Sequence, residues 1–203
     1  MFPQIARMSA DTTEAPAPSP KRDRLMATAS RLFYRDGYRA VGIDTVLAEA
    51  EVAKMTLYNH FASKEDLILA VLAQRSSSFL AALDAAIDEA GRSPQRRLNA
   101  VFDRLKTLFA SDEFKGCAFI RALSEYPDPD HPIHQAAWAH KRAVNARLRT
   151  IADQAEARNP AAVADAISLV IDGTIVAAHA TGSPQWADQA RAAALSLLKS
   201  AIS

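Results

Sequence analysis

Apolar residues recur at intervals of three and four positions along most of the chain, from residue 25 to residue 202. This spacing is typical of amphipathic α-helices, whereas a half-buried strand would alternate apolar and polar residues. Gly37, Gly91 and Pro94 interrupt the pattern where helix ends and helix starts are expected. We therefore predict an all-α fold of about nine helices. The expected helices cover residues 21–36, 43–50, 54–61, 64–90, 94–110, 117–125, 131–157, 160–180 and 184–202.

The first three predicted helices form a small compact unit. Leu25, Ala29, Leu32 and Phe33 give the first helix one apolar face, and Gly37 suits the left-handed cap that ends it. The next two helices are short and are joined by a tight turn at residues 51–53. Such an arrangement predicts a helix-turn-helix domain over residues 21–66.

The second helix of that pair has an unusually polar outer surface. Leu57 and Phe61 lie four residues apart, so they share the face that packs inward. The other side chains are Met55, Tyr58 and Asn59, which point outward, and Lys54, Thr56 and His60 on the flanks. These groups can donate to phosphate oxygens or base edges in a major groove, which favours DNA binding. Alternatively, Tyr58 and His60 form only the solvated edge of a three-helix core.

A new helix is predicted to begin directly after the helix at residues 54–61. Ser63 is a favourable N-cap, and Asp66 stands three residues later in the position of a capping-box acid. Lys64 is thereby held at a helix start, where backbone N–H groups and its ammonium could bind one phosphate together.

The segment TLYNHF at residues 56–61, followed by SKE at residues 63–65, resembles the tetracycline-repressor (TetR) family of transcriptional regulators. The matching motif covers roughly residues 21 to 72. The resemblance implies that Lys54, Met55, Thr56, Tyr58, His60, Lys64 and Thr45 contact DNA. It also implies a homodimer on a palindromic operator, with repression relieved by a small-molecule effector.

Two positions depart from the family pattern. Glu51 occupies the turn position that is usually glycine, and a left-handed conformation there costs a non-glycine residue about 1 kcal/mol. Gly42 stands where the family commonly has a serine or threonine that caps the helix and binds a phosphate. The sequence therefore does not supply that phosphate contact.

Residues 67–203 are expected to form a helical domain for effector binding and dimerisation. An apolar or aromatic effector fits its composition, although aromatic residues at helical spacing also fill ordinary cores. Candidate walls and polar groups of the pocket are Phe79, Phe102, Phe109, Cys117, Phe119, Trp138, His179, Arg121, Glu125 and His134. Two terminal helices with broad apolar bands predict a four-helix dimer interface, although they could instead only cover the core of one subunit. The interface residues expected are Val163, Ile167, Val170, Ile171, Ala178, Ala194, Leu197 and Leu198.

Composition is compatible with this interpretation. Residues 21–64 hold eight Lys or Arg against five acids, while the whole chain has a net charge of only +1. A single cysteine excludes an internal disulfide and fits a reducing cytoplasm, where Cys117 serves either as a small buried side chain or as a sensor. No apolar stretch is judged long enough to span a membrane, so we expect a cytoplasmic protein without membrane contact. Residues 1–20, rich in proline and alanine, are expected to form a disordered tail.

Two other classes of protein remain open at this point. An architectural DNA-binding protein would need no effector and would bind without sequence preference. A metal-dependent enzyme could use Asp128, His131 and His134, with His140 nearby, since carboxylates and imidazoles bind zinc or iron. The same segment also fits a loop and a helix start. We expect no catalytic residues, no metal and no cofactor.

Overall fold

The computed structural model describes residues 19–202, and this part of the chain is built from nine helices and no strand. The all-α prediction is confirmed, with most helix boundaries within one or two residues of those expected. The helices are α1 (Pro20–Asp36), α2 (Ile43–Ala50), α3 (Lys54–Tyr58), α4 (Lys64–Glu89), α5 (Pro94–Phe109), α6 (Ala118–Glu125), α7 (Pro132–Gln154), α8 (Pro160–Thr181) and α9 (Trp186–Ile202).

The first helix begins earlier than the sequence predicted. Ser19 is its N-cap, and the Ser19 hydroxyl accepts a hydrogen bond from the backbone N–H of Arg22. Pro20 occupies the first turn, where its fixed φ suits a helix start and its missing N–H is not needed. These two residues were assigned to the tail and instead belong to α1. The rest of that predicted tail, residues 1–18, lies outside the described residues.

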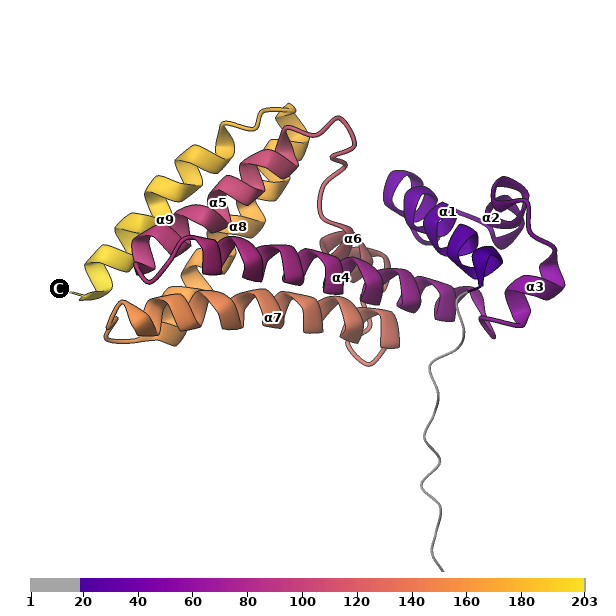
Figure 1. The fold of residues 1–203 in the computed structure, drawn as a ribbon, viewed down its shortest axis with the longest axis horizontal. Coiled ribbons are helices and arrows are strands. Elements are labelled where there is room, and N and C mark those ends of the chain that lie inside the picture. Colours follow the sequence, from indigo (N-terminus) through magenta and orange to yellow (C-terminus); the bar gives the residue numbers. More distant parts are fainter. Residues whose placement is uncertain (1–18, 203) are drawn as a thin grey trace, which may run out of the picture.

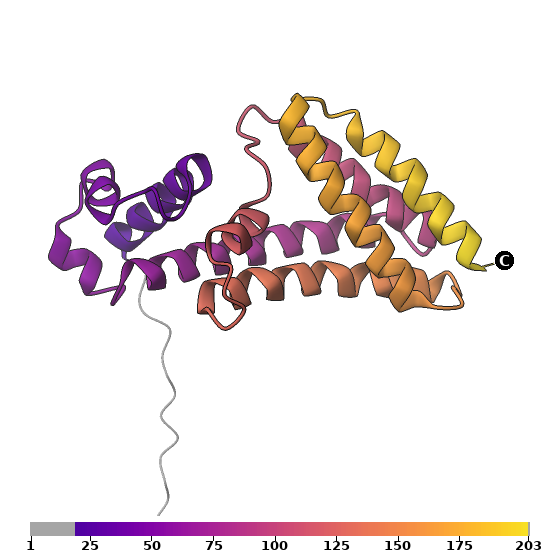
Figure 2. The same ribbon diagram turned by 180° about the vertical axis from the view of Figure 1, so that it is seen from behind.

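The core divides into two clusters along the length of the molecule. The first joins α1, α2 and α3 to the beginning of α4, and it also takes in Phe119 and Ala122 of α6 and Ile133 of α7. The second lies among α5, α8, α9 and the far halves of α4 and α7. Helices α4 and α7 run side by side between the two ends (Figures 1 and 2). Packing of α6 against the first cluster means that the predicted unit of residues 21–66 shares its core with the rest of the chain.

Two of the described helices, α4 and α8, have the length and mean hydropathy of a membrane-spanning helix. The expectation that no stretch is long enough was wrong on this point, because two charged residues in 18 do not lower the mean hydropathy sufficiently. Both helices pack within the protein, and only 39% of the most apolar stretch of α8 is buried there. Helices in the core of a soluble protein can meet the same criteria of length and hydropathy, so these two helices are weak evidence for a membrane span.

Candidate DNA-binding surface and internal cavity

The turn between α2 and α3 depends on a left-handed residue. Glu51 has φ 53° and ψ 46°, as the family pattern implied for this position. This conformation lets the N–H groups of Glu51 and Val52 reach the carbonyls of Ala48 and Leu47, so the end of α2 is satisfied. Glu51 therefore adopts the turn geometry that glycine usually supplies, at a cost in conformational free energy of about 1 kcal/mol.

Helix α3 is shorter than expected and presents the predicted outer surface. Leu57 and Phe61 are buried, as their spacing predicted. The helix ends at Tyr58, because the N–H of His60 bonds the carbonyl three residues back and tightens the chain into a turn. Met55 and Tyr58 are 72% and 46% exposed. The other candidates Thr45, Lys54, Asn59 and His60 are exposed, and Thr56 is half-buried.

Two side chains of this surface make weak contacts within the protein. The Lys54 ammonium lies 3.6 Å from a carboxylate oxygen of Asp44, and both side chains are largely exposed. An exposed pair of this kind contributes at most about 1 kcal/mol. His60 Nε2 lies 3.4 Å from the hydroxyl of Ser19. The surface is therefore polar, accessible and only lightly tied to the protein.

The start of α4 has the predicted cap. Ser63 accepts a hydrogen bond from the N–H of Asp66 at 3.0 Å and donates one to the Asp66 carboxylate at 2.9 Å. Lys64 is half-buried, and its ammonium donates to the main-chain carbonyl of Arg39 at 3.2 Å. Partial burial lowers the pKa of Lys64 below its ordinary value. The arrangement fixes this ammonium beside the first turn of a helix. By contrast, Gly42 gives α2 no side-chain cap.

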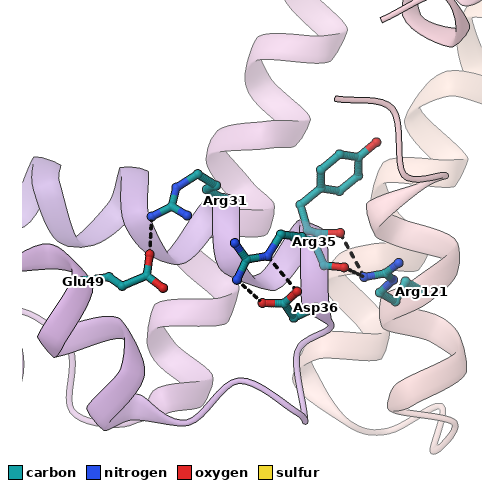
Figure 3. A network of polar contacts seen from close by, with 6 residues as sticks. Arg31, Arg35, Asp36, Glu49 and Arg121 are labelled. Atoms are coloured by element: carbon teal, nitrogen blue, oxygen red, sulfur yellow. Dashed lines mark hydrogen bonds and ion pairs between the residues drawn. The ribbon is translucent and has the colours of Figure 1, made fainter. Parts of the chain in front are cut away.

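A polar network attaches the reading unit to the rest of the molecule (Figure 3). Arg31 of α1 pairs with Glu49 of α2 at 2.6 Å, while Arg35 pairs with Asp36 at the end of α1. Arg121 of α6 donates to the carbonyls of Tyr34 and Arg35 at 2.9 and 3.4 Å. Arg121 was expected to orient a ligand. It instead caps the last carbonyls of α1, where a cation is favoured by the helix dipole.

A cavity of about 420 Å³, partly open to the surface, lies between helices α1–α3 (the reading unit) and the rest of the helices. Its wall includes Ser30 and Tyr34 of α1 and Arg75 of α4. Of the predicted pocket residues, Phe79, Cys117 and Phe119 line this cavity. Burial raises the pKa of the Cys117 thiol, which favours the protonated, less reactive form.

The other predicted pocket residues lie elsewhere. Phe102 is fully buried in the second core cluster, and Trp138 is 52% exposed on α7. Phe109 and His179 line a separate hollow of about 340 Å³, beside Phe114. Outside both, Glu125 accepts a hydrogen bond from the N–H of Arg39, and His134 lies 2.8 Å from the carbonyl of Tyr126.

Sequence reasoning missed most of the polar wall of the cavity. The residues concerned are Tyr34, Gln74, Arg75, Ser78, Arg104, His140 and Lys141. Arg75 lies four positions before Phe79, so its place on the same face of α4 could have been read from helical periodicity. The part of the wall contributed by α1 could not be predicted in this way, because it depends on how α1 packs against α4 and α6.

His140 forms part of this wall as a neutral side chain. Its ring stacks on Phe119 with a centroid separation of 3.5 Å, and its Nδ1 lies 2.9 Å from the hydroxyl of Ser76. Burial lowers the pKa of His140 from 6.5 to about 4, because the charged form loses its hydration. The imidazole therefore carries no charge at neutral pH.

The residues of the alternative metal site are held apart by their own contacts. His131 lies 3.6 Å from Glu65, His134 bonds the carbonyl of Tyr126, and Asp128 accepts from the N–H of Asp130. Within residues 19–202, no three His, Cys, Asp or Glu side chains are close enough together to hold a metal ion. The geometry offers no support for the enzyme hypothesis.

The predicted interface residues of α8 and α9 are mostly turned into their own subunit. Of the eight, Val170 and Leu197 are half-buried and the others are buried in the second core cluster. These side chains therefore belong largely to the core of one subunit, where α8 packs mainly on α7 and α9. The exposed face instead carries Leu169 and Val176, which are 75% and 57% exposed, with Gly173 between them.

The left-handed turn, the buried Leu57 and Phe61, and the polar outer face of α3 together define a helix-turn-helix DNA-binding protein. Residues 25–71 match the family model described as "Bacterial regulatory proteins, tetR family", and residues 94–194 match "Tetracyclin repressor-like, C-terminal domain". The crystal structure of SCO4454, a TetR-family regulator from Streptomyces coelicolor, is 32% identical with a TM-score of 0.85. That match covers 90% of this chain and 96% of the other.

Two further relatives agree with this assignment. The crystal structure of a TetR transcriptional regulator (sav143) from Streptomyces avermitilis is 30% identical, with a TM-score of 0.79 over 90% of this chain and 98% of that one. The HTH-type transcriptional regulator YjdC of Escherichia coli is 24% identical over 155 residues, which are 76% of this chain and 81% of YjdC. The chain belongs to the TetR family of transcriptional regulators.

Proposed function

We propose that this regulator binds a palindromic operator as a homodimer in the cytoplasm, represses transcription, and is released when a small molecule enters the internal cavity. The observation that carries the proposal is the composition of the cavity wall. Ser30 and Tyr34 of the reading unit line the same cavity as Phe79, Phe119 and Val144 of the helical core. A ligand there contacts both parts, so it can favour one of their relative positions over another.

The DNA-binding role is assigned to the exposed side of α2 and α3 and the start of α4. Thr45, Lys54, Met55, Thr56, Tyr58, Asn59, His60 and Lys64 are the residues assigned to it. This assignment is supported by the exposure of Met55 and Tyr58 and by the Ser63 cap, which holds Lys64 at the start of α4. We assign contacts with base edges to α3 and contacts with phosphates to Lys64 and Thr45.

The homodimer is assigned to the exposed face of α8. Leu169, Gly173 and Val176 lie four and three residues apart, so they share one side of the helix. The exposed leucine and valine are apolar, and a Cβ built on Gly173 would meet no atom within 4 Å in its own subunit. A glycine between two apolar side chains allows a second helix to approach closely. Two reading units on a twofold axis then reach successive major grooves when they lie about 34 to 36 Å apart.

Selection of bound sequences from a pool of random duplexes tests the proposal. The expected outcome is enrichment of a palindrome or near-palindrome, bound by a dimer and released by a compound that also raises the melting temperature of the free protein. Binding that tracks only duplex charge, with no enriched sequence, would support an architectural role instead. No catalytic activity is assigned to the chain.

A further inference from the structure

The internal cavity has an uncompensated positive charge. Among the described residues that line it, Arg75, Arg104 and Lys141 are cationic and none is acidic. Lys141 forms an ion pair with Asp172, so its charge is already neutralised. His140 faces the same space from α7 and is kept neutral by its burial. The excess charge therefore resides on the two arginines.

The two arginines differ in what they already bind. Arg75 donates to the hydroxyl and the carbonyl of Ser30, each at 3.0 Å, and its guanidinium lies 4.4 Å from the ring centroid of Tyr34. The side chain of Arg104 makes no hydrogen bond or ion pair with any other described residue, and its Nε is buried without a partner. A guanidinium that has no acceptor in the protein and lines a cavity offers its donors to an acceptor on a ligand, which such a contact would stabilise.

The rest of the wall suits an aromatic body. Phe79, Phe114 and Phe119 contribute rings, and the guanidinium carbon of Arg104 lies 5.9 Å from the ring centroid of Phe79. The cavity volume of about 420 Å³ falls in the range of small-molecule sites. A flat apolar group can pack among these rings while one polar group reaches Arg104.

We propose that the effector is an aromatic carboxylate whose carboxylate group binds the guanidinium of Arg104, with Arg75 adding to the positive potential. The planar fork of an arginine matches a carboxylate, which can accept two parallel hydrogen bonds from it. The inference deepens the proposed function and rests on it for the biological role. The binding step itself requires no DNA.

Three probes with the same ring system test the charge preference: 2-naphthoate, 2-naphthylmethanol and 2-naphthylmethylamine. Calorimetric titration of the full-length protein at pH 7 is expected to give at least tenfold tighter binding for the acid than for the alcohol, and weaker binding still for the amine. A charge-assisted hydrogen bond accounts for a difference of about this size. Equal or tighter binding of the alcohol or the amine overturns the proposal, as does absence of 2-naphthoate binding at millimolar concentration.

Variants locate the contact. Arg104→Gln is expected to weaken 2-naphthoate binding about tenfold or more while leaving binding of the alcohol nearly unchanged. Arg104→Lys retains the charge without the planar fork, so we expect an intermediate loss. Arg96→Gln removes an exposed arginine of the same helix that does not line the cavity, and serves as the matched control. Unchanged selectivity for the acid in both folded Arg104 variants contradicts the assignment.

Ligand binding and operator release are separable in these experiments. If 2-naphthoate binds through Arg104 but leaves the operator duplex bound, the ligand assignment stands and release from the cavity is contradicted. If the alcohol binds as tightly as the acid and also releases the duplex, release stands and the carboxylate assignment is overturned.

Discussion

The guanidinium of Arg121 donates a hydrogen bond of 2.9 Å to the main-chain carbonyl of Tyr34, which joins two residues 87 positions apart. The bond runs from α6 to the last turn of α1 (Figure 3). Tyr34 also faces the cavity, and its hydroxyl donates to the carbonyl of Gly116 at 2.8 Å. The end of α1 is thus held by the loop and helix that form one side of the ligand site.

Arg121→Gln is expected to weaken communication between the cavity and the DNA-binding surface. Ligand binding at one site typically changes affinity at the other by about 5- to 150-fold. We expect the variant to lose most of this change in operator affinity caused by the ligand. Because Arg121 does not line the cavity, 2-naphthoate should bind with nearly unchanged affinity. Operator affinity measured with and without saturating ligand checks this. Arg149→Gln, an exposed change on α7, is the control, and an unchanged ratio in Arg121→Gln would show that this contact transmits nothing.

Substitutions on the reading surface should weaken operator binding while the dimer stays intact. Lys64→Ala is expected to lower affinity for all duplexes alike and to reduce the salt slope by about one for each phosphate that the variant no longer binds. Tyr58→Ala should cost about 1 to 3 kcal/mol if it reads a base edge, and should relax the selected sequence at that position. Fluorescence anisotropy over a salt series measures both effects. Wild-type affinity in both variants would refute the assignment, and the exposed Arg92→Ala provides the control.

Gly173→Glu should separate dimer formation from folding of the subunit. A side chain at this position meets no atom of its own subunit, and replacing glycine within a helix favours the helix by up to about 1 kcal/mol. In a dimer packed through α8, the same side chain would enter the close contact and bring in an unpaired charge. Sedimentation should therefore show a folded monomer with weak operator binding. A fully dimeric variant would exclude this face, and Ala85→Glu on the exposed side of α4 serves as control.

Burial of neutral His140 makes folding sensitive to acid. The pKa of His140 is about 4 when folded and 6.5 ordinarily, so between these values the unfolded chain binds more protons. Stability from this residue is complete above pH 6.5 and declines as pH falls toward 4. From pH 7 to pH 4.5 the loss should be about 2 to 3 kcal/mol.

His140→Gln removes this linkage, so its free energy of unfolding should fall less over the same pH interval. Urea unfolding of both proteins at pH 7 and pH 4.5 gives the comparison. His60→Gln, which removes an exposed imidazole on the DNA-binding surface, is the matched control. Parallel pH profiles for wild type and His140→Gln would contradict the role assigned to His140.

Local patterns were sufficient to predict much of the DNA-binding surface. Ser63 and Asp66 form the expected cap, and Leu57 and Phe61 face inward, because helix capping and helical spacing act over three or four residues. The strained turn at Glu51 followed from the family pattern. The end of α3 at Tyr58 was not predicted, since continuing apolar periodicity does not distinguish a helix from a tightened turn.

The cavity was harder to predict because its wall depends on tertiary packing. Trp138 was predicted to line the pocket and is exposed, whereas Arg104 was not predicted and lines the cavity. Similarly, the broad apolar band of α8 predicted an interface without indicating which side the subunit itself would bury. Ile167 and Leu169 are two residues apart and differ in outcome, one buried and the other exposed. Helical periodicity identifies faces, but contacts between distant helices decide their use.

The central claim is that two copies of the chain present residues 54–60 to successive major grooves. Structure determination of the protein bound to its selected duplex tests this most directly. The expected result is a twofold-symmetric complex in which α3 of each subunit lies in a major groove and Lys64 lies within hydrogen-bonding distance of a phosphate. A complex in which another surface contacts the duplex, or in which α3 faces away from it, would contradict the claim.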